Sequence, residues 1–264
     1  MALPNGLRHR KEKTYGVLVL VVSLAVWLFY GTTAIVLILQ KPKFLGITVF
    51  YTVLIALVLL ISRAFYRAYI VGHYVMVSPD QFPTLFAAVQ RGAQALGMAR
   101  TPRAFVFNGN GVLSAFAVRL FGTPYVLLTA SLIDAETDSQ VHFVVGHELG
   151  HHAAGHLNFW KNLLLFPGRL VPLLGTAYYR SRELTCDRVG AYLVQDPDAA
   201  RGALAMLACG SARLNAQLNC DAFEAQEALV PGLSGWLLHI VSPYPRLTAR
   251  VAAVAAYYRQ PKAA

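Results

Sequence analysis

Two histidines and a glutamate stand at helical spacing in the segment His147-Glu148-Leu149-Gly150-His151 of this 264-residue chain. Residues four apart lie one above the other on an α-helix, so the imidazoles of His147 and His151 point the same way and can bind one metal ion. Glu148 lies one residue further round, where it can accept a proton from an attacking water but cannot easily replace either histidine as a ligand. This pattern is typical of zinc-dependent peptide-bond hydrolysis.

The residues around this segment bear on whether it binds a metal. HExxH also occurs in helices that bind nothing, and this is the alternative interpretation. However, the preceding run 141–146 is mostly apolar, which predicts a buried helix from about Asp138 with its polar edge facing a cleft. Gly150 is a small residue between the two histidines, where another stretch of backbone can approach closely. Both features favour a metal site.

A zinc ion held by two histidines needs a third protein ligand, and Glu183 followed by Asp187 provides a candidate pair. On a second helix, this spacing lets Glu183 reach the metal while Asp187 accepts a hydrogen bond from a ligand imidazole. A three-histidine site of the extended HExxHxxGxxH type is excluded, because the chain has Ala154 and Leu157 at the required positions. The alternative is a solvated helix face on which both carboxylates pair with nearby arginines, namely Arg180, Arg182 and Arg188.

With these two motifs, the chain resembles the HtpX and CAAX prenyl protease family of membrane zinc metallopeptidases. The family's third-ligand helix has the form Arg-x-x-Glu-x-x-Ala-Asp, which Arg180, Glu183 and Asp187 match, with Cys186 in the alanine position. The resemblance extends over roughly residues 65–255 and includes the segment Ser114-Ala115-Phe116-Ala117. It implies a gluzincin-type domain that binds one Zn²⁺ through His147, His151 and Glu183, with Glu148 as the catalytic base.

The chain departs from the family pattern at two places. The family often carries a His-Pro pair before an arginine, whereas Tyr244-Pro245 precedes Arg250 here. We therefore expect Tyr244 or His239 to stabilise the developing oxyanion. HtpX-like members also carry two membrane spans between the metal helix and the third-ligand helix, but only about thirty residues separate the two motifs here. That length is too short for two spans and their turns.

The amino-terminal quarter predicts a membrane anchor. The uncharged apolar stretches 15–39 and 44–62 are each long enough to cross a bilayer, and the turn Gln40-Lys41-Pro42-Lys43 joins them. A cleaved signal peptide is the alternative for the first stretch, but its apolar region exceeds the usual length of about 7–15 residues. We expect a basic amino terminus at 1–13, a transmembrane hairpin at 14–62 and a zinc metallopeptidase domain at 63–264.

The basic residues beside the two spans predict their orientation. Six of them stand on the outer flanks and two in the connecting turn, so both flanks are expected to be cytoplasmic. The catalytic domain would then lie on the cytoplasmic side of a cell membrane, as in the inner membrane of a bacterium. The flanking residues are Arg8, Arg10, Lys11, Lys13, Arg63 and Arg67, and the turn contains Lys41 and Lys43.

The net charge of +10 also raises the question of nucleic-acid binding. The basic residues are scattered and form no recognised groove-reading motif, so the expected partners are polypeptide substrates and a lipid bilayer rather than nucleic acid. The three cysteines form no CxxC pair and imply no disulfide framework. Cys186 is expected to be a small core residue directed away from Glu183. Four other histidines, His142, His152, His156 and His239, are expected to pack or to face solvent rather than to bind the metal.

The fold class predicted for the remaining chain is mainly α with a small β-sheet. The stretches 104–107, 113–119 and 125–128 predict short strands, and helices are expected at 84–96, at 197 to about 218 and from about 247. The strand at 125–128 is expected to pair with the substrate backbone. Prolines interrupt the apolar stretches 162–179 and 228–245, so we expect surface segments there, the second anchored by Trp236.

These features predict a membrane-anchored zinc metalloendopeptidase that cleaves misfolded or membrane-associated proteins. The alternative is a proteolytically inactive, membrane-anchored zinc-binding or regulatory module. Glu148 argues against the alternative, because a structural zinc requires a fourth protein ligand and has no use for a base.

Overall fold

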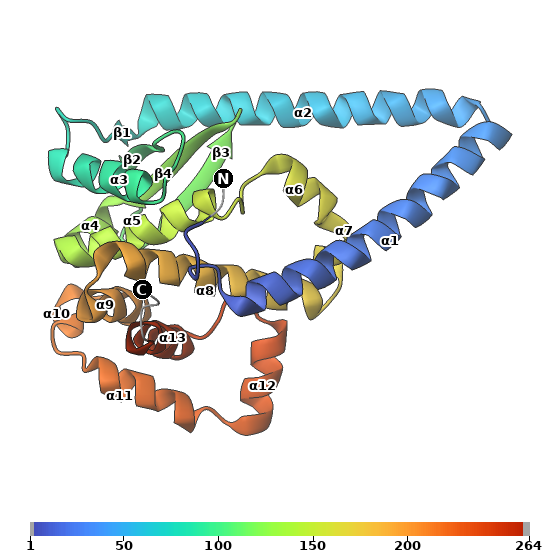
Figure 1. The fold of residues 1–264 in the computed structure, drawn as a ribbon. Helices are drawn as coiled ribbons and strands as arrows, with labels where there is room; N and C mark the ends of the chain where they lie inside the picture. Colours follow the sequence, from blue (N-terminus) through green and yellow to red (C-terminus); the bar gives the residue numbers. More distant parts are fainter. Residues whose placement is uncertain (1–2, 261–264) are drawn as a thin grey trace.

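Two long helices project from one side of a mainly helical domain in the computed structural model, which describes residues 3–260 (Figure 1). Helix α1 covers Arg10–Gln40 and helix α2 covers Lys43–His73, with the turn at Lys41 and Pro42 between them. Both are long and apolar enough to cross a membrane, by length and composition. Of the residues in α2, only Ile70 is buried. A helix with so little buried surface needs an apolar environment other than this domain.

A four-stranded mixed sheet forms the upper part of the domain, with strand order β1-β2-β4-β3. Strands β2 and β4 are parallel, and the other two neighbouring pairs are antiparallel. The strand bounds are Val75–Met76 for β1, Arg103–Phe107 for β2, Ala115–Leu120 for β3 and Thr123–Thr129 for β4. The central strand β4 is buried on both faces, whereas β3 forms an edge of the sheet.

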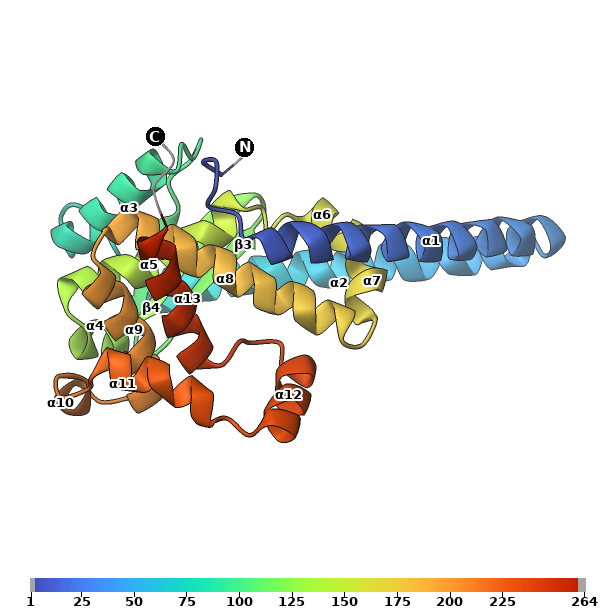
Figure 2. The same cartoon turned by 60° about the horizontal axis from the view of Figure 1, so that its bottom comes forward.

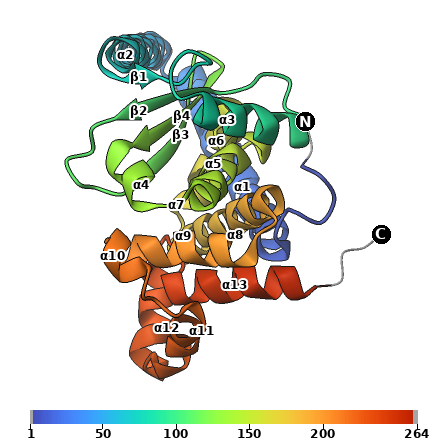
Figure 3. The same ribbon diagram turned by 90° about the vertical axis from the view of Figure 1, so that its left-hand side faces the viewer.

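The alternating side chains of β4 divide the apolar core between the two faces of the sheet. Val126 and Leu128 join the main core, which includes residues of α3 (Pro83–Ala95) and α5 (Asp138–Ala153). Tyr125 and Leu127 pack on the opposite face, against Ile70 near the end of α2. Figure 3 shows α2 above this outer face and α5 below the sheet. The second long helix is therefore built into the domain.

Helices α8 (Leu174–Val194) and α9 (Pro197–Cys209) pack on the other side of α5, and α13 (Leu247–Arg259) lies beyond them (Figure 3). Helix α5 therefore lies between the sheet and α8 and α9, and most of its residues are buried. The remaining short helices are α4 (Ala130–Ala135), α6 (Phe159–Leu164), α7 (Phe166–Leu170), α10 (Ala212–Asn215), α11 (Cys220–Ala225), the 3₁₀ helix η1 (Gln226–Leu229) and α12 (Gly232–Val241).

The structure confirms the predicted fold class, a mainly helical chain with a small sheet and an amino-terminal helix pair. It corrects one helix, because the helix expected to run to about residue 218 ends at Cys209. Gly210 follows in the left-handed conformation, with φ of +67°, which is a common way to end a helix. The stretch 228–245 contains α12, whose ten residues are too few to cross a bilayer.

The predicted pairing of residues 125–128 with substrate is wrong. These residues lie in β4, which is already hydrogen-bonded to β2 on one side and β3 on the other. A strand with two neighbours has no free backbone groups to offer. The edge strand beside it is β3, whose pairing within residues 3–260 is with β4 alone.

One buried carboxyl group gives a prediction about stability. Glu136 is 8% exposed, and neither of its carboxylate oxygens has a hydrogen-bond partner within residues 3–260. Burial raises the pKa of Glu136 to about 8. The folded state therefore holds a proton that the unfolded state loses above about pH 4.5, so stability is greatest below that pH and falls as the pH rises towards 8. The loss is at most about 1.4 kcal/mol per pH unit.

Replacing Glu136 by Gln should remove this dependence, because the amide does not ionise. We expect the Glu136→Gln protein to melt at a higher temperature than the parent at pH 8 and at a similar temperature at pH 5, as measured by thermal unfolding in detergent. Asp134→Asn is the matched control, since Asp134 is exposed on the same short helix. An equal change in melting temperature at both pH values would contradict the prediction.

Candidate metal centre

The close packing of α5 on α8 brings the two sequence motifs together. A Cβ atom added to Gly146 would lie 2.9 Å from the Cα of Gly190, and one added to Gly190 would lie 2.7 Å from the carbonyl oxygen of Phe143. Only glycine at these positions lets the two backbones approach so closely. Gly150 also faces α8, as its position between the histidines suggested, with a Cβ there 3.2 Å from the Cα of Cys186.

The structure places His147, His151 and Glu183 around one point. The Nε2 atom of His147 lies 3.4 Å from Oε2 of Glu183, and Nε2 of His151 lies 3.6 Å from Oε1 of the same carboxylate. These separations are close to the ligand–ligand edge of a tetrahedron whose metal–ligand bonds are about 2.1 Å long. One carboxylate therefore spans both imidazoles, as a shared metal ion would require.

The charge environment of His147 favours a cation. Burial disfavours a charged imidazole, but the hydrogen bonds to Asp187 and Glu183 outweigh this effect and raise the pKa of His147 to about 10. The His147 charge in turn helps to lower the pKa of Glu183 to about 2, against the effect of burial. Two carboxylates thus stabilise positive charge at this point, whether it is carried by a proton or by a metal ion.

Asp187 orients His147 from the side away from Glu183. Nδ1 of His147 lies 2.9 Å from Oδ1 of Asp187, so the ring donates there and directs Nε2 toward Glu183. Arg250 of α13 donates to both Asp187 oxygens, over 2.8 and 2.6 Å. Although burial would raise the pKa of Asp187, Arg250 and His147 hold it well below its usual value. The position of Arg250 after Tyr244-Pro245 in the sequence does not indicate this role.

A second chain of polar contacts orients His151. Nδ1 of His151 lies 3.1 Å from Nδ1 of His156, and Nε2 of His156 lies 3.2 Å from Oε1 of Glu12 on α1. If His156 donates to Glu12, its Nδ1 accepts a proton from His151, and Nε2 of His151 keeps its lone pair for a metal. Sequence reasoning missed both residues. A single acidic residue among the basic ones before the first apolar stretch was the available signal for Glu12.

Cys186 is a small buried core residue, as the sequence predicts, and its thiol also lies close to the candidate ligands. The thiol is fully buried, lies 3.6 Å from Nδ1 of His156, and forms a group with His147 and His151 whose potential ligand atoms are within 4.8 Å of one another. Cys186 therefore faces α5, the helix that carries His147 and His151. Burial raises its pKa well above the usual value, which keeps the thiol protonated and makes it a poor ligand. Glu183 offers the better third donor.

Glu148 lies in the same cavity as the three potential ligands. Burial raises the pKa of Glu148 to about 7, although the charge of His147 and a hydrogen bond from the backbone of Ala117 both favour the carboxylate. A carboxyl group with a pKa near neutrality can both accept and return a proton. Glu148 lies on α5 and accepts a hydrogen bond from the backbone of Ala117 in β3, so it lies between the candidate ligands and the edge of the sheet.

The cavity has a volume of about 610 Å³ and is bounded by β3, α5, α8 and α9. Residues 113–118 form one wall, and Tyr244 and Arg250 contribute to another. Tyr244 therefore lies where the sequence analysis expected an oxyanion donor. His239, the other candidate, is on α12 and is not among the residues that line this cavity. Of the two candidates, the structure favours Tyr244.

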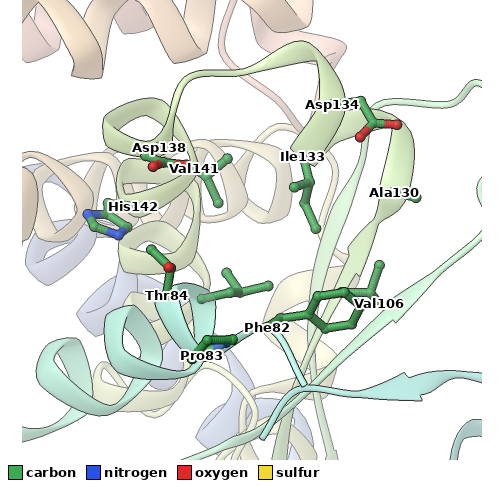
Figure 4. A pocket seen from close by; sticks show the side chains of 11 residues that line it. Phe82, Pro83, Thr84, Val106, Ala130, Ile133, Asp134, Asp138, Val141 and His142 are labelled. Atoms are coloured by element: carbon green, nitrogen blue, oxygen red, sulfur yellow. The ribbon is translucent and has the colours of Figure 1, made fainter. Parts of the chain in front are cut away.

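A separate cavity of about 380 Å³ lies between α3, α4 and α5 (Figure 4). Phe82, Ile133 and Val141 border it, and Asp138 and His142 lie at its edge. It shares no lining residue with the cavity that contains Glu148. We therefore assign no part of the hydrolytic site to it.

The chain is similar to known metallopeptidases in sequence and in fold. The model for peptidase family M48 matches residues 79–165, which include the metal helix. The plastoglobule-localized metallopeptidase 48 of the Arabidopsis thaliana chloroplast is 30% identical over an alignment of 205 residues, and the match covers 68% of this chain and 59% of that protein. The crystal structure of S. mikatae Ste24p superposes with a TM-score of 0.54 at 15% identity, covering 89% of this chain and 64% of that one.

These matches confirm the resemblance to the HtpX and CAAX prenyl protease family. The similarity to Ste24p concerns the fold, since the sequence identity is low. The chain spans about three fifths of the length of the curated relative.

The contact between Glu12 and His156 predicts an effect on metal affinity. We expect Glu12→Gln to weaken zinc binding by about tenfold, because the amide is a weaker acceptor and no longer fixes the tautomer that His156 passes on to His151. Competition with a chromophoric chelator measures this change. Glu224→Gln is the control, since Glu224 lies on α11 and pairs with Arg201 and Arg259. Equal zinc affinity in the two variants would show that Glu12 does not support the site.

Proposed function

We propose that this chain is a membrane-anchored zinc metalloendopeptidase. Its sequence matches peptidase family M48, and its fold is similar to that of Ste24p. The observation that carries the proposal is the position of Glu148, which lies in one cavity with His147, His151 and Glu183. Histidine nitrogens and a carboxylate oxygen are ligands that Zn²⁺ commonly binds in proteins. Three protein ligands leave a position open for substrate or water. We propose one zinc ion per chain.

The proposed chemistry assigns a role to each group. When bound, zinc supplies Lewis acidity to the scissile carbonyl and acidifies water. Glu148 accepts the proton of the attacking water and returns it to the departing amine, which its raised pKa permits. The hydroxyl of Tyr244 donates a hydrogen bond to the oxyanion that develops on the former carbonyl oxygen. Asp187 and Arg250 position His147.

The edge strand β3 supports an extended polypeptide as the substrate. Residues 115–118 line the cavity, and β3 is paired with β4 on its other side. A substrate strand that adds to β3 would bring its backbone past Glu148. Only an unfolded or extended segment can form such a strand, so we propose that misfolded or membrane-associated proteins are the substrates.

The location of the protein is proposed from its two apolar helices and its charge distribution. We propose that residues 14–62 anchor the chain in a bacterial inner membrane and that the metallopeptidase domain, residues 63–264, lies on the cytoplasmic side with the short basic segment 1–13. An inactive regulatory module on the same scaffold is the alternative. Retention of Glu148 in the cavity favours the enzyme, because a structural metal does not need a base.

Replacing the proposed base should separate catalysis from metal binding. We expect Glu148→Gln to lower the rate of casein cleavage by at least about 100-fold, because the amide cannot accept a proton. Zinc content, measured by atomic absorption on the purified protein in detergent, should stay near one ion per chain. A chelator should abolish cleavage by the parent enzyme, and added zinc should restore it. Retained cleavage in Glu148→Gln would exclude this assignment of the base.

Tyr244 and His239 provide a matched pair for the oxyanion donor. Tyr244→Phe should lower kcat by about 100-fold with little change in KM, because the lost hydrogen bond forms mainly in the transition state. His239→Ala should leave both constants near those of the parent, since His239 lies outside the cavity. Steady-state kinetics with a fluorogenic peptide distinguishes these outcomes, and a larger loss in His239→Ala than in Tyr244→Phe would reverse the assignment.

A further inference from the structure

Residues 159–173, which form α6, α7 and the connection to α8, expose an unusual amount of apolar surface. Trp160 is 73% exposed and Leu170 is 65% exposed. Six further large apolar side chains of the segment are exposed, namely Phe159, Leu163, Leu164, Phe166, Val171 and Leu173. So many exposed apolar side chains in one short segment are rare on a surface that faces water.

The segment contacts α1 well beyond the last charged residue before its apolar stretch, Lys13. The amide nitrogen of Gly168 donates to Oγ of Ser23 over 2.9 Å, and a Cβ on Gly168 would lie 2.3 Å from the carbonyl oxygen of Val19. One helical turn further, Nε1 of Trp27 donates to the carbonyl oxygen of Leu164 over 3.0 Å. Figure 1 shows α6 and α7 between the two long helices, on the side nearest the domain.

The positions of these contacts along α1 indicate how deep residues 159–173 lie in a bilayer. Val19, Ser23 and Trp27 stand four, eight and twelve residues after Tyr15, where the apolar stretch begins. At the rise of an α-helix, these positions lie roughly 6, 12 and 18 Å along α1. The hydrocarbon core of a bilayer is about 30 Å thick. If α1 crosses the membrane, the turn between α6 and α7 lies inside the hydrocarbon.

The second long helix gives an independent marker of the membrane surface. Arg63 is the first charged residue after the apolar stretch of α2, and its guanidinium carbon lies 4.8 Å from the centre of the Phe159 ring. A basic residue at the end of a span is expected at the level of the headgroups. Helix α6 thus begins at the surface beside Arg63 and descends to the level of Trp27, while α7 leads back to α8.

Polar groups at that depth need partners within the protein. The carbonyl oxygen of Leu164 and the amide of Gly168 bind side chains of α1. Two of the three guanidinium nitrogens of Arg169 donate to Asn162 and to the hydroxyl of Tyr179, and its guanidinium also stacks on the Tyr179 ring. The segment therefore hides polar groups and exposes apolar ones, which is the arrangement expected in lipid.

From this geometry we propose that residues 159–173 form a re-entrant helix pair whose partner is the acyl chains of the leaflet next to the domain. This proposal rests on the membrane anchoring proposed above. It also fixes the level of the metal centre, because the side-chain amide of Asn162 donates to the carbonyl oxygen of His156 over 2.8 Å. Since His156 contacts His151, the hydrolytic site lies at the membrane surface.

The chain has three tryptophans, one each in α1, α6 and α12, and they allow a direct test by fluorescence. The Trp236→Phe protein retains Trp27 and Trp160, and the double variant Trp160→Phe/Trp236→Phe retains Trp27 alone. Both would be reconstituted in vesicles of phosphatidylcholine and phosphatidylglycerol that contain spin-labelled lipids. The difference between the two proteins isolates the emission of Trp160 without disturbing the hydrogen bond of Trp27.

We expect labels near the top of the acyl chain to quench at least half of the Trp160 emission, and labels in the middle of the chain to quench Trp27 more strongly. Quenching of Trp27 together with free access of aqueous acrylamide to Trp160 would overturn the re-entrant pair and leave the anchor intact. Shielding of Trp160 from both lipid labels and acrylamide would indicate a protein partner and would also overturn it. Failure of lipid labels to quench Trp27 would refute the anchor itself.

A tryptophan introduced at the end of α7 provides a second test. In the background that retains Trp27 alone, Leu170→Trp should add emission that lipid labels quench. Leu214→Trp should add emission that acrylamide quenches, because Leu214 is 51% exposed on α10, at the far end of the domain from the hairpin (Figure 2). Equal acrylamide access at the two positions would contradict the proposal. Far-ultraviolet circular dichroism checks that each variant keeps its helical content.

Discussion

The contact between Gly146 of α5 and Gly190 of α8 is the constraint on which the candidate site depends. The two motifs lie on different helices, and the side chain of Glu183 is short. Glu183 can span His147 and His151 only if the backbones that carry them nearly touch. Protein interiors are close-packed and relax only partly, so even one added methyl group at this crossing would separate the helices or strain them. The geometry that suits a metal is thus a property of helix packing.

Two hydrogen-bonded arms then orient the imidazoles from opposite sides. One runs from Arg250 through Asp187 to His147, and the other runs from Glu12 through His156 to His151. They begin at opposite ends of the chain, on α13 and on α1. Burying these charges costs free energy, and removing one partner would leave the other uncompensated. These hydrogen bonds therefore connect both α1 and α13 to the candidate metal ligands.

The sequence predicted those features that depend on local spacing, namely the HExxH helix, the Glu183 and Asp187 pair, the two apolar helices and the short strands. It did not predict features that depend on long-range packing. Nothing in the spacing of Glu12 indicates that it meets His156 across more than a hundred residues. The order of the strands in the sheet does not follow from their order in the sequence. Residues 125–128 of β4 were therefore expected to pair with the substrate, although β3 is the edge strand beside it. The end of α9 was predictable, because Gly210 is a common helix terminator. The burial of Cys186 was predicted, but its closeness to His147 and His151 was not, since helical spacing says nothing about the neighbouring helix.

Helix α2 continues without a break from Lys43 to His73, and its last turns rest on the outer face of the sheet through Ile70. A straight helix of that length behaves as a rigid rod. Transmembrane helices change their tilt when the thickness of the bilayer changes. Any such tilt would carry β4 and the adjoining β3 with it, while α1 holds the metal helix through Glu12. If residues 14–62 anchor the chain in a membrane, as proposed, the distance between β3 and the proposed base Glu148 would then change with the lipid composition.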